Sequence, residues 1–153
     1  MNRQAMQQMA KLARQEILDA LTEWMEAWNQ HDLEGVMALF HEDVVFEHWT
    51  GSRIRGKKAL RRAWSPWFAD HKDFRFDVRD LFVDKDAQKA LLMWTLDWPC
   101  PSNGQNGDRE RREGVDVLNF SEGKIVQKAT FSKTRIRIGD RVTLLEPQQH
   151  QEP

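Results

Sequence analysis

The part of the chain that decides the fold is residues 29–48, which read NQHDLEGVMALFHEDVVFEH. Asp32 precedes a short apolar run with helical spacing, so we expect it to cap the start of a second helix. Residues 44–49 are β-branched and aromatic, which predicts a strand. Alternation along that strand places Val44, Phe46 and His48 on one face. The segment therefore predicts a helix followed by a strand that carries a histidine toward one side of a sheet.

The composition is typical of one domain with an aromatic core. The chain has 153 residues, and we expect residues 1–145 to form a single domain and the polar residues 146–153 to be a disordered tail. Seven Trp and eight Phe supply much of the core volume. Because the chain has no Tyr, no phenol is available as a proton donor.

Charge and spacing exclude several classes of function. A net charge of −1 indicates no nucleic-acid partner. The single Cys100 cannot form an internal disulfide, and no Cys/His spacing is typical of a zinc site. No apolar run approaches the ~20 residues that cross a bilayer, and the polar N-terminus lacks the apolar core of a signal peptide. The sequence has no phosphate-binding glycine loop, so no nucleotide cofactor is indicated. Taken together, these features lead us to expect a cytoplasmic protein with no cofactor, metal or membrane partner.

The rest of the chain predicts helices followed by a meander of strands. Helical spacing covers residues 17–28 and 60–68, with Pro66 expected to kink the latter helix or begin a new turn. From Phe74 onward the period is two, which predicts strands at 74–79, 87–98, 109–120 and 125–138, a loop at 99–108 and a turn at 121–124. The order α-α-β-α-β-β-β-β favours an α+β fold: three N-terminal helices on a curved mixed or antiparallel sheet, with a cone-shaped cavity between them.

The strand at 87–98 is apolar on both faces, so both faces need a cover. The helices cover one face. A second copy of the same sheet is the simplest cover for the other, and we therefore expect a homodimer through the outer sheet face.

Several short motifs resemble one superfamily. They are WNQHDLEG at 28–35, LFHEDV at 39–44, RGKKAL at 55–60, and DVLNF at 116–120 followed by GKIV at 123–126. Over roughly residues 15–135 the chain resembles the nuclear transport factor 2-like superfamily, and within it the SnoaL-like and ketosteroid-isomerase-like proteins. The resemblance implies the cone-shaped α+β barrel, also called cystatin-like. This fold carries isomerases, polyketide cyclases, dehydratases, epoxide hydrolases and binding domains, so it does not decide the function.

The resemblance also suggests site positions. The oxyanion tyrosine of a ketosteroid isomerase falls at Trp24, its general-base aspartate at His48, and its protonated aspartate at Asp116. Only Asp116 is identical, and the loss of the tyrosine argues against efficient steroid isomerisation. The similar SnoaL-like cyclases keep an acid at the position of Asp116, and similar dehydratases combine a histidine with an aspartate.

We expect His48 and Asp116 to be the catalytic residues. An unperturbed histidine pKa of about 6.5 suits proton transfer near neutral pH. The alternative for His48 is a half-buried strand residue bonded to a backbone carbonyl. A carboxylate between Val115 and Val117 is costly to bury unless it is paired, hydrogen-bonded or protonated. Asp116 would donate to a substrate oxygen or orient His48, or it would simply pair with an arginine among residues 109–112. The expected pocket walls are Trp24, Phe46, Trp64, Phe68, Trp94 and Leu118.

Two features stay open at this level. The short turn at 121–124 leaves the register of the last hairpin undecided, so either Lys128 or Ala129 faces the pocket. The charged run RERRE at residues 109–113 is either a solvated strand end or the rim of a pocket that favours an anionic substrate.

The leading hypothesis is a cofactor-independent acid/base enzyme, an isomerase, cyclase or dehydratase acting on a small, largely apolar carbonyl compound in a hydrophobic pocket. The alternatives are a non-catalytic homodimeric domain that binds a small apolar molecule, and a structural dimer whose own tryptophans fill the pocket. Water attack on an epoxide is a further option, with Asp116 and Arg111 as the candidate pair.

Overall fold

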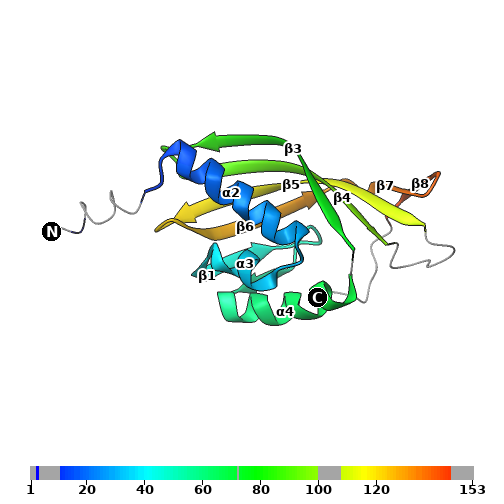
Figure 1. Cartoon of the computed structure of the whole chain (residues 1–153), viewed down its shortest axis with the longest axis horizontal. Helices are drawn as coiled ribbons and strands as arrows, with labels where there is room; N and C mark the ends of the chain where they lie inside the picture. Colours follow the sequence, from blue (N-terminus) through cyan, green and yellow to red (C-terminus); the bar gives the residue numbers. More distant parts are fainter. Residues whose placement is uncertain (1–2, 4–10, 72, 100–107, 146–153) are drawn as a thin grey trace.

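Three helices and one mixed sheet make up the described part of the chain (Figure 1). The structure is a computed structural model that describes residues 3, 11–71, 73–99 and 108–145. The helices are α2 (Arg14–Asn29), α3 (Leu33–Ala38) and α4 (Lys57–Asp70). The strands are β1 (Phe40–Glu47), β2 (Arg53–Arg55), β3 (Arg75–Asp84), β4 (Lys89–Pro99), β5 (Arg109–Ser121), β6 (Lys124–Ser132), β7 (Arg135–Ile138) and β8 (Arg141–Leu144).

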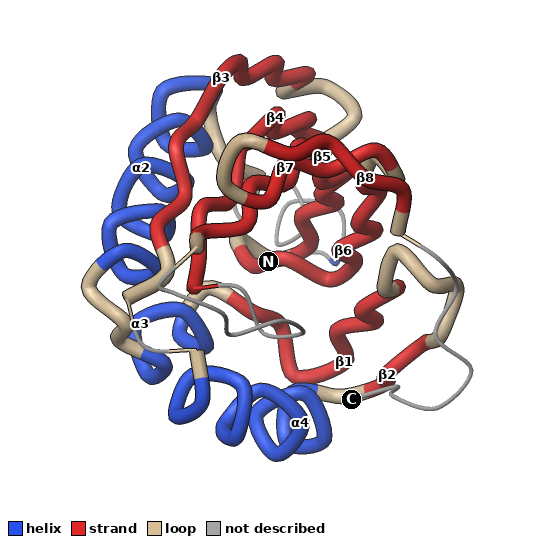
Figure 2. Tube along the Cα trace, turned by 90° about the vertical axis from the view of Figure 1, so that its right-hand side faces the viewer, coloured by secondary structure: helices blue, strands red, loops and turns tan. Residues whose placement is uncertain are grey.

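The sheet has the order β2-β1-β6-β5-β4-β3, and β7 joins β5 to β8. The β1–β6 pair is parallel and the other pairs are antiparallel. Seen end-on, the sheet curls strongly and the three helices close its open side (Figure 2). The predicted α+β cone is confirmed.

The main differences from the predicted boundaries are in the first, third and last strands, and the strand predicted at 74–79 extends as β3 to Asp84. β1 begins at Phe40 rather than at Val44, and the connection after it contains the short strand β2. The predicted strand 125–138 is broken into β6 and β7. Between the pairs Gly114–Ser132 and Arg111–Arg137, β5 advances three residues and the last strand advances five. The extra residues cannot pair, so the strand breaks there.

Helix α2 forms where apolar residues recur at helical spacing, and it buries that stripe against the sheet. Trp28 is the centre of the core, because its ring packs against those of Trp64, Trp67, Phe68, Phe74 and Phe76. At the end of α2, the Asn29 side chain exchanges two hydrogen bonds with the backbone of Phe76, at 2.8 and 2.9 Å. These bonds fix the helix to β3.

Local signals predicted from the sequence are present. The Asp32 side chain accepts a hydrogen bond from the Gly35 backbone at 3.0 Å, so Asp32 caps α3 as expected. Helix α4 runs through Pro66 without ending there. Glu122 and Gly123 have φ of 53° and 74°, the left-handed pair of a type I′ hairpin turn.

The register of the last hairpin decides which side chains reach the cavity. A shift lies between Asn119 and Phe120, and beyond it Leu118 pairs with Lys128 and Asp116 with Thr130. Lys128 is therefore buried on the inner face, and Ala129 lies on the outer face. This settles the choice that the sequence left open.

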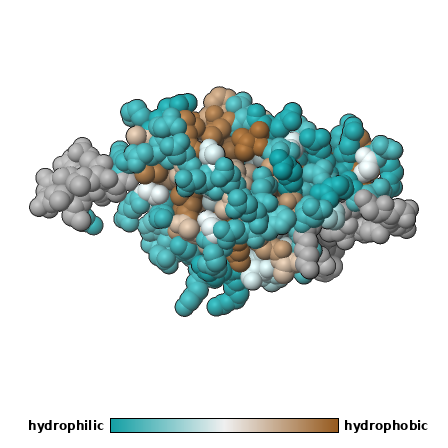
Figure 3. All heavy atoms as spheres, viewed as in Figure 1, coloured by the Kyte–Doolittle hydropathy of each residue, from teal (hydrophilic) through white to brown (hydrophobic). Residues whose placement is uncertain are grey.

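Hydrophilic side chains cover most of the molecular face drawn in Figure 3, and hydrophobic residues show through in separate patches. Among the described helices, none combines the length and apolar character that crossing a membrane requires. The predicted tail 146–153 and most of the predicted loop 99–108 lie outside the described residues.

Candidate active site

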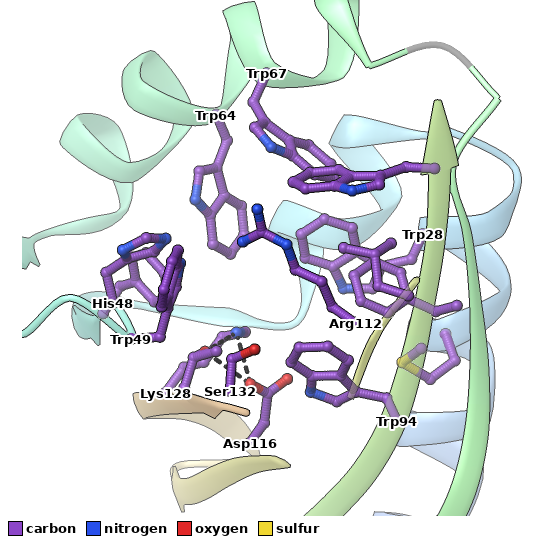
Figure 4. Close-up of a pocket in the computed structure, with 16 residues that line it drawn as sticks. Trp28, His48, Trp49, Trp64, Trp67, Trp94, Arg112, Asp116, Lys128 and Ser132 are labelled. Atoms are coloured by element: carbon purple, nitrogen blue, oxygen red, sulfur yellow. Dashed lines mark hydrogen bonds and ion pairs between the residues drawn. The ribbon is translucent and has the colours of Figure 1, made fainter. Parts of the chain in front are cut away.

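A cavity of about 120 Å³ lies between the inner face of the sheet and the helices (Figure 4). Six of the seven tryptophans help to line it. The lining residues are Met25, Trp28, Phe46, His48, Trp49, Trp64, Trp67, Phe76, Trp94, Leu96, Trp98, Arg112, Asp116, Lys128, Thr130 and Ser132. The wall is thus mainly aromatic, with a few ionisable groups among the rings, as in many small-molecule sites.

Asp116 belongs to a buried polar cluster on β5 and β6. Its Oδ1 accepts hydrogen bonds from Lys128 Nζ at 3.0 Å and from Thr130 Oγ1 at 2.7 Å. Lys128 also donates to Thr130 Oγ1, at 2.5 Å. Among the described residues, no hydrogen bond reaches Oδ2 of Asp116, so one carboxylate oxygen is free at the cavity wall.

Lys128 is held by rings as well as by Asp116. Its Nζ lies 4.9 Å from the ring centroid of Phe46 and 5.9 Å from that of Trp64. An ammonium over aromatic faces gains cation–π attraction that partly replaces its lost hydration. The cavity therefore contains a fixed positive charge next to the free oxygen of Asp116.

His48 follows the end of β1 and reaches the same cavity. Burial, together with the positive charges of Lys128 and Arg112, lowers its pKa from 6.5 to about 4. The imidazole is therefore neutral near pH 7. Its Nδ1 accepts a hydrogen bond from the Thr50 backbone N–H at 3.4 Å and lies 3.0 Å from Thr50 Oγ1. We assign the proton to Nε2 from this bond, which makes Nε2–H a hydrogen-bond donor.

Arg112 enters the cavity from β5, held by a buried carboxylate. Its Nε donates to Glu110 Oε1 at 2.6 Å, and the Glu110 side chain is 1% exposed. The guanidinium carbon lies 5.0 Å from the ring centroid of Trp49 and 4.8 Å from that of Trp98. Figure 4 shows the guanidinium end of Arg112 extending between the aromatic walls.

Two buried donors in the wall have no hydrogen-bond partner within the described part of the chain. They are the enclosed indole Nε1 atoms of Trp94 and Trp98. The ring of Trp94 lies over Gly114, where a Cβ would collide with it. Glycine at this position is what allows the ring to approach the strand so closely.

The structure brings together part of the predicted site. His48, Asp116, Phe46, Trp64 and Trp94 line the cavity. No hydrogen bond between described residues joins His48 to Asp116; Thr50 positions the imidazole instead.

The predicted walls Trp24, Phe68 and Leu118 do not line the cavity. Trp24 turns into the core, where its Nε1 donates to the Val36 carbonyl at 3.1 Å. Phe68 stacks on Trp28 behind the wall, at 5.1 Å. Leu118 is fully buried on β5 beyond Asp116. Trp24 and Leu118 belong to the hydrophobic core in this structure, and Phe68 packs against it.

The charged run at 109–113 follows the alternation of β5. Glu110 and Arg112 share the inner face with Asp116, whereas Arg111 is exposed on the other face. Asp116 pairs with Lys128 rather than with any arginine of this run. Arg109 pairs instead with Asp97 and Asp73. Strand alternation places Arg112 on the same face as Asp116, so the sequence could have identified it as a cavity residue. The inward position of Lys128 depends on the register shift between Asn119 and Phe120, which alternation does not reveal.

Within residues 3, 11–71, 73–99 and 108–145, no three His, Cys, Asp or Glu side chains gather as a metal site requires.

The comparisons with known proteins agree with the observed fold. The family model of the SnoaL-like domain matches residues 21–128. No protein with a curated description matches the sequence significantly.

Solved structures share the fold at low identity. A protein assigned as a polyketide cyclase from Xanthomonas campestris superposes with a TM-score of 0.65 at 18% identity, over 77% of this chain and 90% of that chain. An epoxide hydrolase of Mycobacterium tuberculosis gives 0.61 at 18% identity, over 78% and 84%. A protein assigned as a ketosteroid isomerase from Kribbella flavida gives 0.60 at 20% identity, over 91% and 83%. At these identities the likeness concerns the fold.

Proposed function

This chain belongs to the SnoaL-like domain family, and on that basis we propose that it is a cofactor-independent acid/base enzyme acting on a small carbonyl compound. The reaction would be an isomerisation, cyclisation or dehydration that begins with removal of a proton next to the carbonyl. The single observation that carries the proposal is the free Oδ2 of Asp116 in an aromatic cavity, with Oδ1 tied to Lys128 and Thr130.

Asp116 is the base in this proposal, which reverses the roles expected from the sequence. A carboxylate oxygen that accepts no hydrogen bond from the described residues and lies at the cavity wall is available to take a proton from carbon. His48 is less suited to that task because its Nδ1 lone pair accepts the hydrogen bond from Thr50 N–H, so its Nε2 carries a proton and can only donate.

The remaining groups would stabilise the charge that develops. When Asp116 Oδ2 takes the proton, the electron pair of the C–H bond moves into an enolate whose oxygen carries the negative charge. A neutral His48 with its proton on Nε2 is a donor for that oxygen. The ammonium of Lys128 would favour the anion electrostatically, and protonated Asp116 would return the proton to a different carbon.

The test is proton exchange, which needs no knowledge of the natural product. Small ketones and enones are incubated with the protein in D₂O, and deuterium at the carbon next to the carbonyl is followed by NMR. We expect Asp116→Asn to lose about 10²–10⁴-fold of the exchange rate. Asp97→Asn is the matched control, because Asp97 pairs with Arg109 and does not line the cavity. Exchange by Asp116→Asn at the wild-type rate would remove Asp116 as the base.

A non-catalytic binding domain is the alternative, since the same cavity would also hold a ligand without changing it. Six tryptophans line the cavity, so ligand binding should quench the intrinsic fluorescence. Saturable quenching by a ketone, without exchange at any pH, would favour the binding domain. No quenching by any compound would favour a structural core filled by its own side chains.

We also propose a homodimer through the outer sheet face. An apolar stripe crosses this face through cross-strand pairs of β3, β4, β5 and β6. Its members are Phe82, Leu91, Met93, Val115, Val117, Ala129 and Phe131. Phe82, Met93 and Phe131 are all exposed, and a contiguous exposed apolar patch is typical of an interaction surface.

A further inference from the structure

Arg112 is fixed in place without using most of its hydrogen bonds. Glu110 accepts a hydrogen bond from its Nε, and the guanidinium makes cation–π contacts with the indole rings of Trp49 and Trp98. The side chain is 12% exposed. A guanidinium restrained in this way loses little further conformational freedom when a ligand binds.

The free end of that guanidinium is a fork. Arginine has five N–H donors, and Nε accounts for one of them. Among the described residues, no hydrogen bond reaches Nη1 or Nη2 of Arg112. The two amino groups lie in one plane, and this spacing matches the two oxygens of a carboxylate.

The other polar groups of the cavity are also mainly donors. His48 lines the cavity, and no hydrogen bond among the described residues engages its Nε2–H. Lys128 has three N–H groups and bonds two oxygens, those of Asp116 and Thr130. Among the described residues, the side-chain acceptors at the wall that receive no hydrogen bond are Oδ2 of Asp116 and the hydroxyl oxygen of Ser132. A ligand rich in acceptors would satisfy this excess of donors.

The charge in the cavity points the same way. Glu110 is enclosed behind Arg112, so the cation is the member of that pair that lines the cavity. Lys128 and Arg112 also line the same cavity, so two cationic side chains face the space that a ligand would occupy. An anionic group would be stabilised there.

Position along β5 separates the anion site from the base. Arg112 and Asp116 are four residues apart on the same face of the strand, so their Cα atoms lie about 13 Å apart. A ligand can therefore place an anionic group at Arg112 and a reacting carbon near Asp116 without bringing two negative charges into contact. The cavity volume of about 120 Å³ limits the ligand to roughly one small ring.

We infer that the ligand of this cavity is a small oxo-carboxylic acid, whose carboxylate binds the Nη fork of Arg112 while its carbonyl end lies toward Asp116. This inference names the substrate class of the proposed enzyme and rests on that proposal for the role of Asp116. The binding of the carboxylate itself depends on Arg112 alone.

The experiment compares acids with their amides, which have nearly the same shape but no charge. The probes are 4-oxopentanoate with 4-oxopentanamide, and 3-oxocyclohexane-1-carboxylate with its amide. Dissociation constants come from quenching of tryptophan fluorescence at pH 7. We expect each acid to bind the wild-type protein at least tenfold more tightly than its amide. Equal affinity, tighter binding of the amides, or no binding of either acid would overturn the inference.

Variants assign the preference to Arg112. Arg112→Gln should remove the preference for the acids, and Arg112→Lys should keep only part of it because the fork is lost. The double variant Glu110→Gln/Arg112→Gln avoids leaving a buried carboxylate unpaired, in case the single variant does not fold. Arg111→Gln is the matched control, since Arg111 is exposed on the opposite face. A preference that survives in both Arg112→Gln and the double variant would overturn the inference.

Deuterium exchange on the same probes separates the two proposals. Tight binding of the acids without exchange would support the carboxylate site and rule out the proposed enzyme activity. Exchange that is equally fast for acids and amides, with equal affinities, would keep the enzyme and remove the carboxylate site.

Discussion

Lys128 Nζ lies 3.0 Å from Asp116 Oδ1, and 8% of each side chain is exposed. The two residues come from adjacent strands and sit on a diagonal, since Asp116 pairs directly with Thr130. Thr130 completes the cluster by accepting from Lys128 and donating to Asp116. Each charge therefore depends on the other for the stabilisation that water would otherwise supply.

The first prediction is that Lys128→Met strongly destabilises the protein. Removing the ammonium leaves a buried carboxylate without its counter-ion, and breaking such a pair typically costs about 3–5 kcal/mol. The double variant Lys128→Met/Asp116→Leu should recover most of that loss, because it removes both charges together. Urea denaturation of the single and double variants measures the free energies of unfolding.

Lys133→Met is the matched control for this substitution. Like Lys128, Lys133 pairs with a carboxylate, that of Glu113. It lies just after β6, and its side chain is 70% exposed. We expect its loss to change the free energy of unfolding by less than about 1 kcal/mol. Equal effects of Lys128→Met and Lys133→Met would contradict the account of a buried pair.

The spacing of apolar residues was sufficient to predict the helices and strands of the cone, because this spacing and the turn residues are local features of the sequence. The cap at Asp32 and the type I′ turn at residues 122–123 are local in the same sense. Irregularities in strand pairing could not be predicted from such local patterns. The bulge that turns Lys128 inward and the break after β6 both depend on how distant strands align, which one strand's sequence does not specify.

The site was predicted in part for the same reason. Asp116 was singled out from its polar character within an apolar strand, and His48 mainly from the family resemblance. Trp24 was expected in the wall because the resemblance places it at the oxyanion position, although its helical stripe is equally typical of the core, where its Nε1 bonds the Val36 carbonyl. The roles that we propose for His48 and Asp116 differ from those expected because they depend on neighbours that the sequence does not place, Thr50 at the imidazole and Lys128 and Thr130 at the carboxylate.

The second prediction concerns pH. The pKa of His48 is about 4 in the folded protein and 6.5 ordinarily, so between these values the unfolded chain binds more protons than the folded one. Stability should therefore fall as the pH is lowered from about 6.5 to 4. NMR titration of the imidazole should give a midpoint near 4, and wild-type protein should lose more stability over this interval than His48→Gln.

Lys128→Met provides the control for that titration. Burial is the largest cause of the lowered pKa and Lys128 is the next, so removing the ammonium should raise the His48 midpoint without restoring it to 6.5. An imidazole that titrates near 6.5 in the wild-type protein would show that neither burial nor these charges act as described.

The third prediction tests the close approach of Trp94 to β5. A Cβ at Gly114 would overlap the Trp94 ring and the Phe131 carbonyl oxygen, so Gly114→Ala must displace one or both. We expect a loss of about 1–3 kcal/mol in the free energy of unfolding, as for other overpacked sites. The double variant Gly114→Ala/Trp94→Phe should lose less than the sum of the single changes, because the smaller ring makes room. Strict additivity would show that the two residues do not compete for this space.

The last prediction is that Phe131→Glu converts a dimer to a monomer. Phe131 lies on the apolar stripe of the outer sheet face, directly opposite Val115, and is 54% exposed. A carboxylate there would have to be desolvated against the apolar stripe of the second subunit, since a two-fold interface brings equivalent surfaces together. Light scattering after size-exclusion chromatography should give the mass of two chains for the wild type and of one for the variant.

Val142→Glu is the matched control, because Val142 is 55% exposed but lies on β8, away from the stripe. A wild-type protein that elutes as a monomer at all concentrations would show that the stripe has another use, whereas a dimer broken by Val142→Glu and not by Phe131→Glu would move the interface to the β7–β8 hairpin.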